Sequence, residues 1–317
     1  MYHLFKIAAS LAIKIYCRKT VAYFDSNFSL DRPTIIACNH PNSFFDAINI
    51  AVQYPKPIYF LARGDAFKKP LVAQFLKSLH LIPIYRLSEG KENLSKNTET
   101  FDACLKLLKQ NQTILIFSEG ICVNEWKLRH LKKGTARLAL LAVKDGINDL
   151  EIVPTNINYS SFSTNPKESI IHFNASFKPT DLSKSPESTF YNSFNERLKS
   201  GILNQMVIKD DLNDANLFQT PHTLTTKLSK VLLAIPAFLG FLGNYWIYYI
   251  FKRMALEKTK NTVFYDSVLF GILLLFYPMI IVLLSIIILV IFNFKIGLLF
   301  FITMPVSAWC YKLYKHL

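Results

Sequence analysis

The sequence has little glycine, few charged residues and a shortage of acidic ones. Glycine occurs 10 times in 317 residues, and Asp, Glu, Lys and Arg together make up 18% of the chain, against about 25% in an average soluble protein. Lys and Arg number 36 and Asp and Glu 22, so the net charge is +14. The five cysteines form no Cys-x-x-Cys pair, so we expect neither a disulfide framework nor a metal site.

Apolar and basic residues are what the chain has in abundance. Apolar residues make up 51% and aromatic residues 14%, which excludes a disordered protein. This composition indicates a membrane partner with anionic headgroups. Nucleic acid is the rival explanation of the charge, but it does not explain long uncharged stretches near the C-terminus. We therefore expect membrane lipids and no nucleic acid as partners.

Three stretches near the C-terminus contain no charged residue. They are Val231–Phe251, Ser267–Phe294 and Ile296–Tyr311. A spanning helix needs about 20 apolar residues, so we expect Ser267–Phe294 to cross the membrane and Ile296–Tyr311 to return as a hairpin. Pro236, Gly240 and Gly243 interrupt the first stretch, which predicts a re-entrant or interfacial segment. The alternative is three full spans, which would place residues 1–228 on the other side.

Basic residues mark the ends of this hairpin. Lys252, Arg253, Lys258 and Lys260 precede it and Lys312 and Lys315 follow it, whereas only Lys295 lies in the turn. The excess of Lys and Arg on cytoplasmic loops predicts that the basic ends face the cytoplasm. We therefore expect a cytoplasmic membrane protein whose catalytic part faces the cytoplasm.

Residues 25–209 alternate short apolar runs with helical patterns. Strands are expected at Thr34–Cys38, Pro57–Ala62, Leu81–Tyr85, Thr113–Phe117, Glu151–Asn156 and Ile170–Asn174. Helices are expected at Phe44–Gln53, Ala66–Leu79, Leu94–Lys109, Lys132–Lys144 and Glu187–Leu203. This alternation predicts an α/β fold, with a mixed sheet flanked by helices and chemistry in loops at the strand ends.

The flanking segments complete the expected organisation. Residues 1–24 mix apolar and basic side chains, which favours an amphipathic helix on a membrane surface, with an ordinary packed helix as the alternative. Residues 210–228 are polar, as in a linker, and residues 229–317 form the membrane-associated helical region.

The first candidate site is the run from Asn39 to Asp46, which contains His40. On a continuous helix, six residues turn about 600°, which leaves His40 and Asp46 on different faces. They can meet only if His40 lies in a loop and Asp46 in the first turn of the next helix. An aspartate bonded to one imidazole nitrogen would leave the other nitrogen as a general base for an alcohol. A loop histidine beside a helix cap is the alternative.

Other strand ends carry further candidate residues. Arg86 follows the strand at Leu81–Tyr85 and suits a phosphate. The strand at Thr113–Phe117 runs into Ser118, Glu119 and Gly120, where a carboxylate could hold hydroxyls and glycine admits a substrate close to the backbone. A basic segment that includes Arg129, Lys132 and Lys133 opens the next helix. That is a favourable place for a phosphate, with a solvated basic surface as the alternative.

In this order and spacing, the motifs resemble the glycerolipid acyltransferase family, over roughly residues 30–180. Asn39-His40 with Asp46 resembles its histidine–aspartate motif and Arg86 its phosphate-binding arginine motif. Phe117-Ser118-Glu119-Gly120 resembles its Phe-Pro-Glu-Gly motif, and Val153-Pro154 its proline motif. Five residues rather than four separate His40 from Asp46, as in a subgroup that includes fungal-type glycerol-3-phosphate acyltransferases. Ser118 replaces proline and Ile121-Cys122 replaces the common Thr-Arg, so Arg129, Lys132 or Lys133 is expected to supply the lost cation.

The resemblance implies transfer of a fatty acyl group from acyl-CoA or acyl-carrier protein to a hydroxyl of glycerol-3-phosphate or 1-acylglycerol-3-phosphate. His40 would be the general base and Asp46 would orient it, with no cofactor. Arg86 would bind the acceptor phosphate, and Asn39, Ser118, Glu119 and Gly120 would lie at the substrate. An acyltransferase for another lysolipid and a non-catalytic membrane-surface scaffold are the alternatives. Cys122 as a nucleophile is a further, weaker alternative, since only His130 lies near it in sequence.

Overall fold

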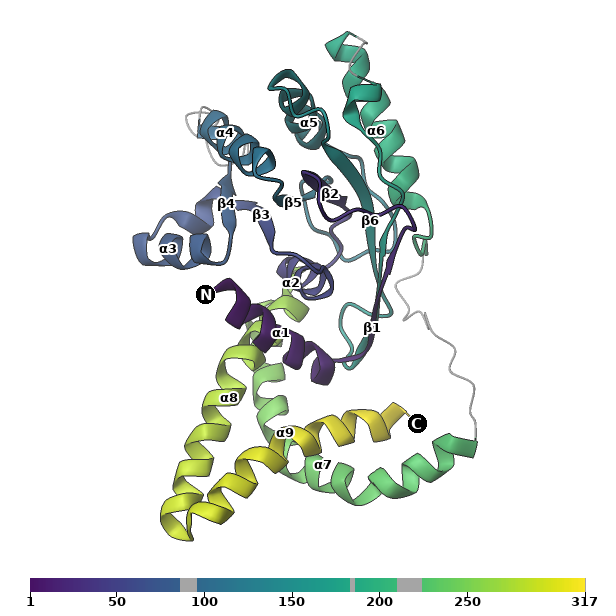
Figure 1. The fold of residues 1–317 in the computed structure, drawn as a ribbon. Coiled ribbons are helices and arrows are strands. Elements are labelled where there is room, and N and C mark those ends of the chain that lie inside the picture. Colours follow the sequence, from purple (N-terminus) through teal and green to yellow (C-terminus); the bar gives the residue numbers. More distant parts are fainter. Residues whose placement is uncertain (86–95, 183–185, 210–223, 317) are drawn as a thin grey trace.

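The computed structural model describes residues 1–85, 96–182, 186–209 and 224–316. Its centre is a seven-stranded sheet of order β1-β7-β6-β2-β5-β3-β4 (Figure 1). The strands are β1 (Cys17–Phe24), β2 (Thr34–Cys38), β3 (Ile58–Arg63), β4 (Leu81–Ile84), β5 (Thr113–Phe117), β6 (Glu151–Tyr159) and β7 (Lys167–Phe173). β6 and β7 pair antiparallel and the other neighbours pair parallel. The predicted mixed sheet is confirmed.

Helices cover both faces of the sheet (Figure 1). They are α1 (Tyr2–Tyr16), α2 (Phe44–Gln53), α3 (Pro70–Ser78), α4 (Lys96–Lys109), α5 (Gly134–Lys144) and α6 (Glu187–Leu203). One buried cluster contains Ile13 of α1 and Phe45 of α2. The other contains Phe101 of α4, Leu138 of α5 and Phe194 of α6. The sheet therefore lies between two apolar layers.

The N-terminal segment differs from its prediction. The helix ends at Tyr16, and Cys17–Phe24 is a strand that pairs with β7, so a helix over residues 1–24 is wrong. The strand contains Thr20, Val21 and Tyr23, and β-branched and aromatic side chains suit a pleated surface. The helix α1 carries apolar side chains on both its buried face and its exposed face. Its inner face is buried at Ile13, while apolar side chains of its outer face, such as Leu4 and Leu11, are exposed.

Three long helices follow in the C-terminal region: α7 (Leu224–Lys258), α8 (Tyr265–Ile291) and α9 (Phe294–His316). Each is long and apolar enough to cross a membrane. α8 and α9 form the predicted hairpin. Val231–Phe251 belongs to one continuous helix, α7, with Pro236 inside it, and its re-entrant or interfacial course stays a prediction. The first residues of α7, 224–228, form the end of the predicted linker. Residues 210–223 of that linker lie outside the described residues.

The glycines of α7 serve helix packing rather than a break. A Cβ atom at Gly240 would lie 2.0 Å from the backbone oxygen of Ser307 on α9, and one at Gly243 would lie 3.0 Å from the sulfur of Met304. Small residues let membrane helices approach closely. The Asn244 side chain adds hydrogen bonds from Nδ2 to Gly240 O at 3.1 Å and to Met304 O at 3.2 Å.

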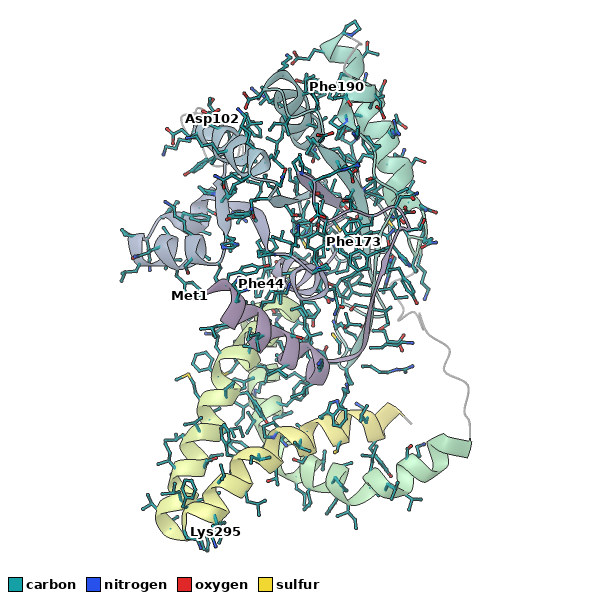
Figure 2. The ribbon with its side chains drawn as sticks, viewed as in Figure 1. Met1, Phe44, Asp102, Phe173, Phe190 and Lys295 are labelled. Atoms are coloured by element: carbon teal, nitrogen blue, oxygen red, sulfur yellow. The ribbon has the colours of Figure 1, made fainter. Side chains whose placement is uncertain are left out.

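The C-terminal helices α7, α8 and α9 share a buried core with the sheet. One buried cluster joins Phe251 of α7, Phe270 of α8 and Met304 of α9 to Ile36 of β2 and Phe45 of α2. Figure 2 shows the side chains of both regions in place, with Phe44 near the junction and Lys295 at the far end of the hairpin. The C-terminal helices are therefore packed onto the α/β part and are not a detached anchor.

Candidate functional site

The candidate site forms where two neighbouring parallel strands end. Cys38, the last residue of β2, pairs with Phe117, the last residue of β5. The loops after these strands carry His40 and Glu119, so the two residues meet at one edge of the sheet. The backbone N–H of His40 donates to Oε1 of Glu119 at 3.2 Å. This is the strand-end placement that the sequence predicts.

His40 and Asp46 are in contact. Nδ1 of His40 lies 2.9 Å from Oδ2 of Asp46. His40 is in the loop, α2 begins at Phe44, and Asp46 is in its first turn, which is the arrangement that the six-residue spacing requires. The His40 side chain is 16% exposed and that of Asp46 is fully buried. Because a carboxylate accepts from Nδ1–H, the Nε2 atom remains free to accept a proton.

Asp46 is held by two further donors. The hydroxyl of Tyr159 donates to Oδ1 at 2.8 Å and the backbone N–H of Asn42 donates to Oδ2 at 2.8 Å. Burial raises the pKa of Asp46, and its contacts with His40, Asn42 and Tyr159 oppose that rise. These donors favour the charged form that a protonated imidazole needs beside it.

The His40 ring is held by stacking and lies beside a second carboxyl group. The imidazole stacks on Phe117, with ring centroids 3.8 Å apart and planes 13° apart. Glu119, which accepts a hydrogen bond from the His40 backbone, is 4% exposed. Burial raises the pKa of its carboxyl to about 7, and the charge of nearby Asp46 adds to the rise. A carboxylate of this kind is positioned to accept hydrogen bonds from hydroxyls.

The loop after β5 is hydrogen-bonded to the loop that carries His40. Asn124 Nδ2 donates to Pro41 O at 2.6 Å, and the backbone N–H of Ser43 donates to Sγ of Cys122 at 2.9 Å. Burial raises the pKa of the Cys122 thiol to about 12. Since the thiolate is the reactive form, this argues against Cys122 as a nucleophile.

Ser118, Gly120 and Lys132 shape the wall beside Glu119. Ser118 Oγ lies 3.0 Å from Oγ1 of Thr135, and the backbone N–H of Lys132 donates to Ser118 O at 2.8 Å. Gly120 has a φ of +70°, and a Cβ there would lie 3.1 Å from Cγ of Lys132. Glycine adopts such a φ at little cost. The buried Ser118 therefore supports the loop, and the stem of exposed Lys132 lies over Gly120.

The other candidate residues have different surroundings. Asn39 is buried, and its side chain exchanges two hydrogen bonds with the backbone of Ile157 on β6, at 3.1 and 2.8 Å. Arg129 pairs with Glu125 at 2.9 Å. The ammonium of Lys133 lies 6.0 Å from the ring centre of Tyr191 on α6. Arg86 lies outside the described residues. The structure thus brings His40, Asp46, Glu119, Gly120 and Lys132 together, while Asn39 joins the β2 end to β6.

The sequence reasoning missed the residues of α8 that reach the His40 loop. Asp266, which is 1% exposed, accepts from Asn42 Nδ2 at 2.5 Å, bonds the Tyr16 hydroxyl, and pairs with Lys167 at 2.8 Å. Ser267 Oγ donates to Asn42 O at 2.9 Å and accepts from the Phe45 backbone N–H at 3.0 Å. The sequence does contain a signal for this role, since Asp266 stands in the first turn of an otherwise apolar helix of 27 residues. Ionisable residues in membrane segments are costly and often functional.

Chemically, the arrangement is an α/β protein with a buried aspartate orienting a partly exposed histidine, beside a second carboxyl group. It can remove a proton from a hydroxyl bound near Nε2 of His40 and return it to a leaving group. Among the described residues, no group of three or more His, Cys, Asp or Glu could hold a metal ion.

Comparison with known proteins shows a similarity to acyltransferases. The family model described as Acyltransferase matches residues 19–158, the stretch that carries His40, Asp46 and Glu119. Over 118 residues the chain is 28% identical to the 1-acyl-sn-glycerol-3-phosphate acyltransferase of Bacillus subtilis, covering 37% of this chain and 54% of the relative. Over 134 residues it is 23% identical to a chloroplastic enzyme of that name from Arabidopsis thaliana, covering 42% and 36%. The site-bearing part is therefore related to acyltransferases at low identity.

These matches are partial. The chain aligns with about half of the bacterial relative and about a third of the plant one. Among solved structures, the 1-acyl-sn-glycerophosphate acyltransferase of Thermotoga maritima is similar, with 17% identity and a TM-score of 0.48. That match covers 66% of this chain and 81% of the other.

Proposed function

We propose that this protein transfers a fatty acyl group from a thioester to a hydroxyl of glycerol-3-phosphate or 1-acylglycerol-3-phosphate at a membrane. The observation that carries the proposal is the contact between His40 and the buried Asp46, which leaves Nε2 of a partly exposed imidazole available as a base. The match of residues 19–158 to the acyltransferase family supports the reaction class.

In the proposed reaction, Nε2 of His40 takes the proton of the acceptor hydroxyl as its oxygen attacks the thioester carbonyl carbon. The imidazolium is stabilised by Asp46, whose other contacts keep it ionised. The tetrahedral intermediate collapses, the carbon–sulfur bond breaks, and the departing sulfur takes the proton from Nε2. The products are the acylated acceptor and a free thiol, so atoms and charge balance with no covalent acyl-enzyme.

The acceptor is proposed to bind along the edge that carries Glu119. The Glu119 carboxylate would hold a glycerol hydroxyl, and Gly120 would admit the glycerol to the backbone. Lys132, exposed beside Gly120, is well placed for the phosphate, with Arg129 and Arg86 as further cations. The donor is acyl-CoA or acyl-carrier protein. Asn39 and Ser118 are proposed to position the loops rather than to touch substrate, because both are buried and hydrogen-bonded to protein.

We also propose that the helices α7 to α9 hold the protein in a cytoplasmic membrane with the site facing the cytoplasm. Three helices of sufficient length and hydropathy support membrane association. The basic residues near the ends of the α8–α9 hairpin support the orientation.

The test is an acceptor panel on the purified full-length chain in detergent. One radiolabelled acyl-CoA is supplied with glycerol-3-phosphate, dihydroxyacetone phosphate, lysophosphatidate or a lyso-aminolipid. Labelled lysophosphatidate or phosphatidate is the expected product, and His40→Ala should lower its rate by at least about 10²-fold, since general-base catalysis contributes that much or more. His172→Ala, at a half-buried histidine on β7, is the control. Equal rates for His40→Ala and the unchanged protein would contradict the mechanism, and acylation of only the lyso-aminolipid would contradict the acceptor.

A further inference from the structure

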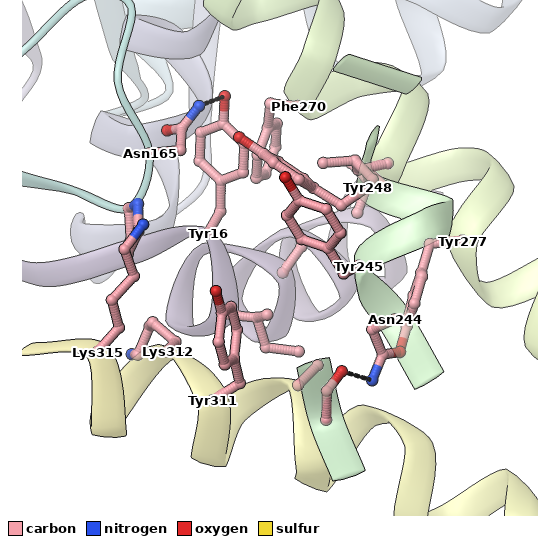
Figure 3. A pocket seen from close by; sticks show the side chains of 17 residues that line it. Tyr16, Asn165, Asn244, Tyr245, Tyr248, Phe270, Tyr277, Tyr311, Lys312 and Lys315 are labelled. Atoms are coloured by element: carbon pink, nitrogen blue, oxygen red, sulfur yellow. Dashed lines mark hydrogen bonds between the residues drawn. The ribbon is translucent and has the colours of Figure 1, made fainter. Parts of the chain in front are cut away.

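A cavity of about 210 Å³ lies among the C-terminal helices, apart from His40. Its walls come from α1, α7, α8, α9 and the turn at Asn165-Pro166, so residues from the two ends of the chain meet there (Figure 3). Aliphatic and aromatic side chains form most of it. The aromatic residues are Tyr16, Tyr245, Tyr248, Phe270, Tyr277 and Tyr311.

On one side of the cavity, the polar side chains are hydrogen-bonded within the protein. The hydroxyl of Tyr277 donates to Oδ1 of Asn244 at 2.7 Å, and Nδ2 of Asn244 donates to Gly240 O and Met304 O. These polar groups therefore satisfy one another. Leu273 and Leu274 of α8 also line the cavity. The cavity is therefore a mainly apolar slot between helices long enough to span a membrane.

The other side is cationic. Figure 3 shows Lys312 and Lys315 on the side opposite Tyr277. The ammonium of Lys312 donates to Lys14 O at 2.5 Å and to Cys17 O at 3.2 Å, at the C-terminal end of α1. Two backbone carbonyls and the negative end of a helix dipole therefore lie beside this ammonium. Lys315 is exposed at the rim.

Within the described part of the chain, the lining of the cavity is basic and not acidic. Among the described residues that line it, none is Asp or Glu. Asp266 lies behind Tyr16, but its carboxylate is taken up by Lys167, Asn42 and Tyr16. The cavity thus joins an apolar slot to a positive rim with no Asp or Glu among its described lining residues. Basic pockets between membrane helices are suited to anionic lipid headgroups.

We propose that this cavity binds one anionic phospholipid of the surrounding membrane. An acyl chain lies among α1, α7, α8 and α9, and the phosphate contacts Lys315, with Lys312 contributing its charge. The site is separate from the proposed acyl-transfer site and does not depend on that function. Bound there, the lipid links α1 to α7, α8 and α9 and stabilises the packing of these helices on the α/β part.

The test measures lipid binding to the full-length chain purified in a neutral detergent. Phosphatidylglycerol and phosphatidylcholine with identical acyl chains are added separately, and bound lipid is counted by native mass spectrometry, with thermal unfolding recorded in parallel. We expect phosphatidylglycerol to bind about fivefold or more tightly and to raise the unfolding temperature, because each lysine near a headgroup favours an anionic one by about that factor. Equal binding of the two lipids would overturn the proposal.

Two variants locate the site. Lys315→Gln should remove the preference for phosphatidylglycerol. Lys295→Gln removes the same charge at the start of α9, in the turn at the far end of the hairpin (Figure 2), and should keep the preference. Leu274→Trp should fill the slot and abolish binding of both lipids while circular dichroism shows unchanged helix content. If Lys315→Gln binds like Lys295→Gln, or a folded Leu274→Trp protein still binds, the cavity is not the site. Tighter binding of lysophosphatidate than of phosphatidylglycerol would make it a substrate site and would also overturn the proposal.

Discussion

The side chain of Asn42 donates a hydrogen bond from Nδ2 to Oδ2 of Asp266, which lies 224 residues further along the chain. The backbone N–H of the same Asn42 donates to Oδ2 of Asp46. One loop residue therefore joins the aspartate that orients His40 to the first turn of α8. The candidate membrane helix α8 therefore contacts the loop that carries the proposed base.

Substitution of Asp266 tests this link. Asp266→Asn should lower kcat by about ten- to a hundredfold, since a hydrogen bond to a charged group is worth about 1.5–3 kcal/mol. KM should change little, because Asp266 is buried behind the loop. The measurement is steady-state acyl transfer over a range of acceptor concentrations.

A second variant separates this effect from loss of stability, because Asp266→Asn alone leaves the fully buried Lys167 unpaired. Replacing a buried ion pair by apolar residues is often neutral for stability. The double variant Lys167→Met/Asp266→Leu should therefore unfold near the temperature of the unchanged protein and still have a low kcat. Full kcat in the stable double variant would show that Asp266 does not position the loop.

Tyr159→Phe should move the pH dependence of acyl transfer. The variant loses the hydrogen bond from the Tyr159 hydroxyl to Asp46, which favours the carboxylate, so the already raised pKa of Asp46 rises further. The acidic limb of the rate profile should shift to higher pH. Tyr54→Phe is the matched control, since Tyr54 is also buried but bonds Thr113 at the start of β5, 3.3 Å away. A common profile for both variants would count against a role for Tyr159 in holding Asp46.

Glu119→Gln should change how stability depends on pH. Burial raises the pKa of Glu119 from 4.5 to about 7, so the folded protein binds this proton more tightly than the unfolded chain. The resulting stability is present below pH 4.5 and is lost as the pH rises through about 7. The variant lacks this titration, so its unfolding temperature should fall less than that of the unchanged protein between pH 5 and pH 8. Glu196→Gln, at an exposed glutamate on α6, should retain the full fall, and an identical fall in Glu119→Gln would refute the shifted pKa.

Gly240→Ala should destabilise the packing of α7 against α9. The added Cβ would lie 2.0 Å from a backbone oxygen of α9, so α7 and α9 would have to separate, and overpacking of this kind costs about 1–3 kcal/mol. Gly134→Ala at the start of α5 is the control, because nothing lies within 4 Å of a Cβ there. Thermal unfolding in detergent should show a lower transition temperature for the first variant only. A lowered transition in both would point away from the contact of Gly240 with α9.

Much of the fold could be predicted because its signals are local. The strands at Thr34–Cys38 and Thr113–Phe117 and the helix at Phe44–Gln53 begin and end where the sequence predicts. Residues 17–24 were misassigned, because their basic and apolar side chains resemble an amphipathic surface until β7 is present to pair with them. The glycines of α7 looked like breaks, because the sequence does not show that α9 lies against them.

By itself the sequence determined the α/β order of elements, the long apolar helices and the placing of His40 and Glu119 at strand ends. These follow from periodicity, composition and spacing within a few residues. Only the tertiary structure decided that Asp46 receives a hydroxyl from Tyr159 and that Asp266 and Ser267 hold the loop around Asn42. Such contacts depend on which buried surfaces pack together across more than a hundred residues of chain. The structure therefore makes α8, a candidate membrane helix, part of the support of the proposed site.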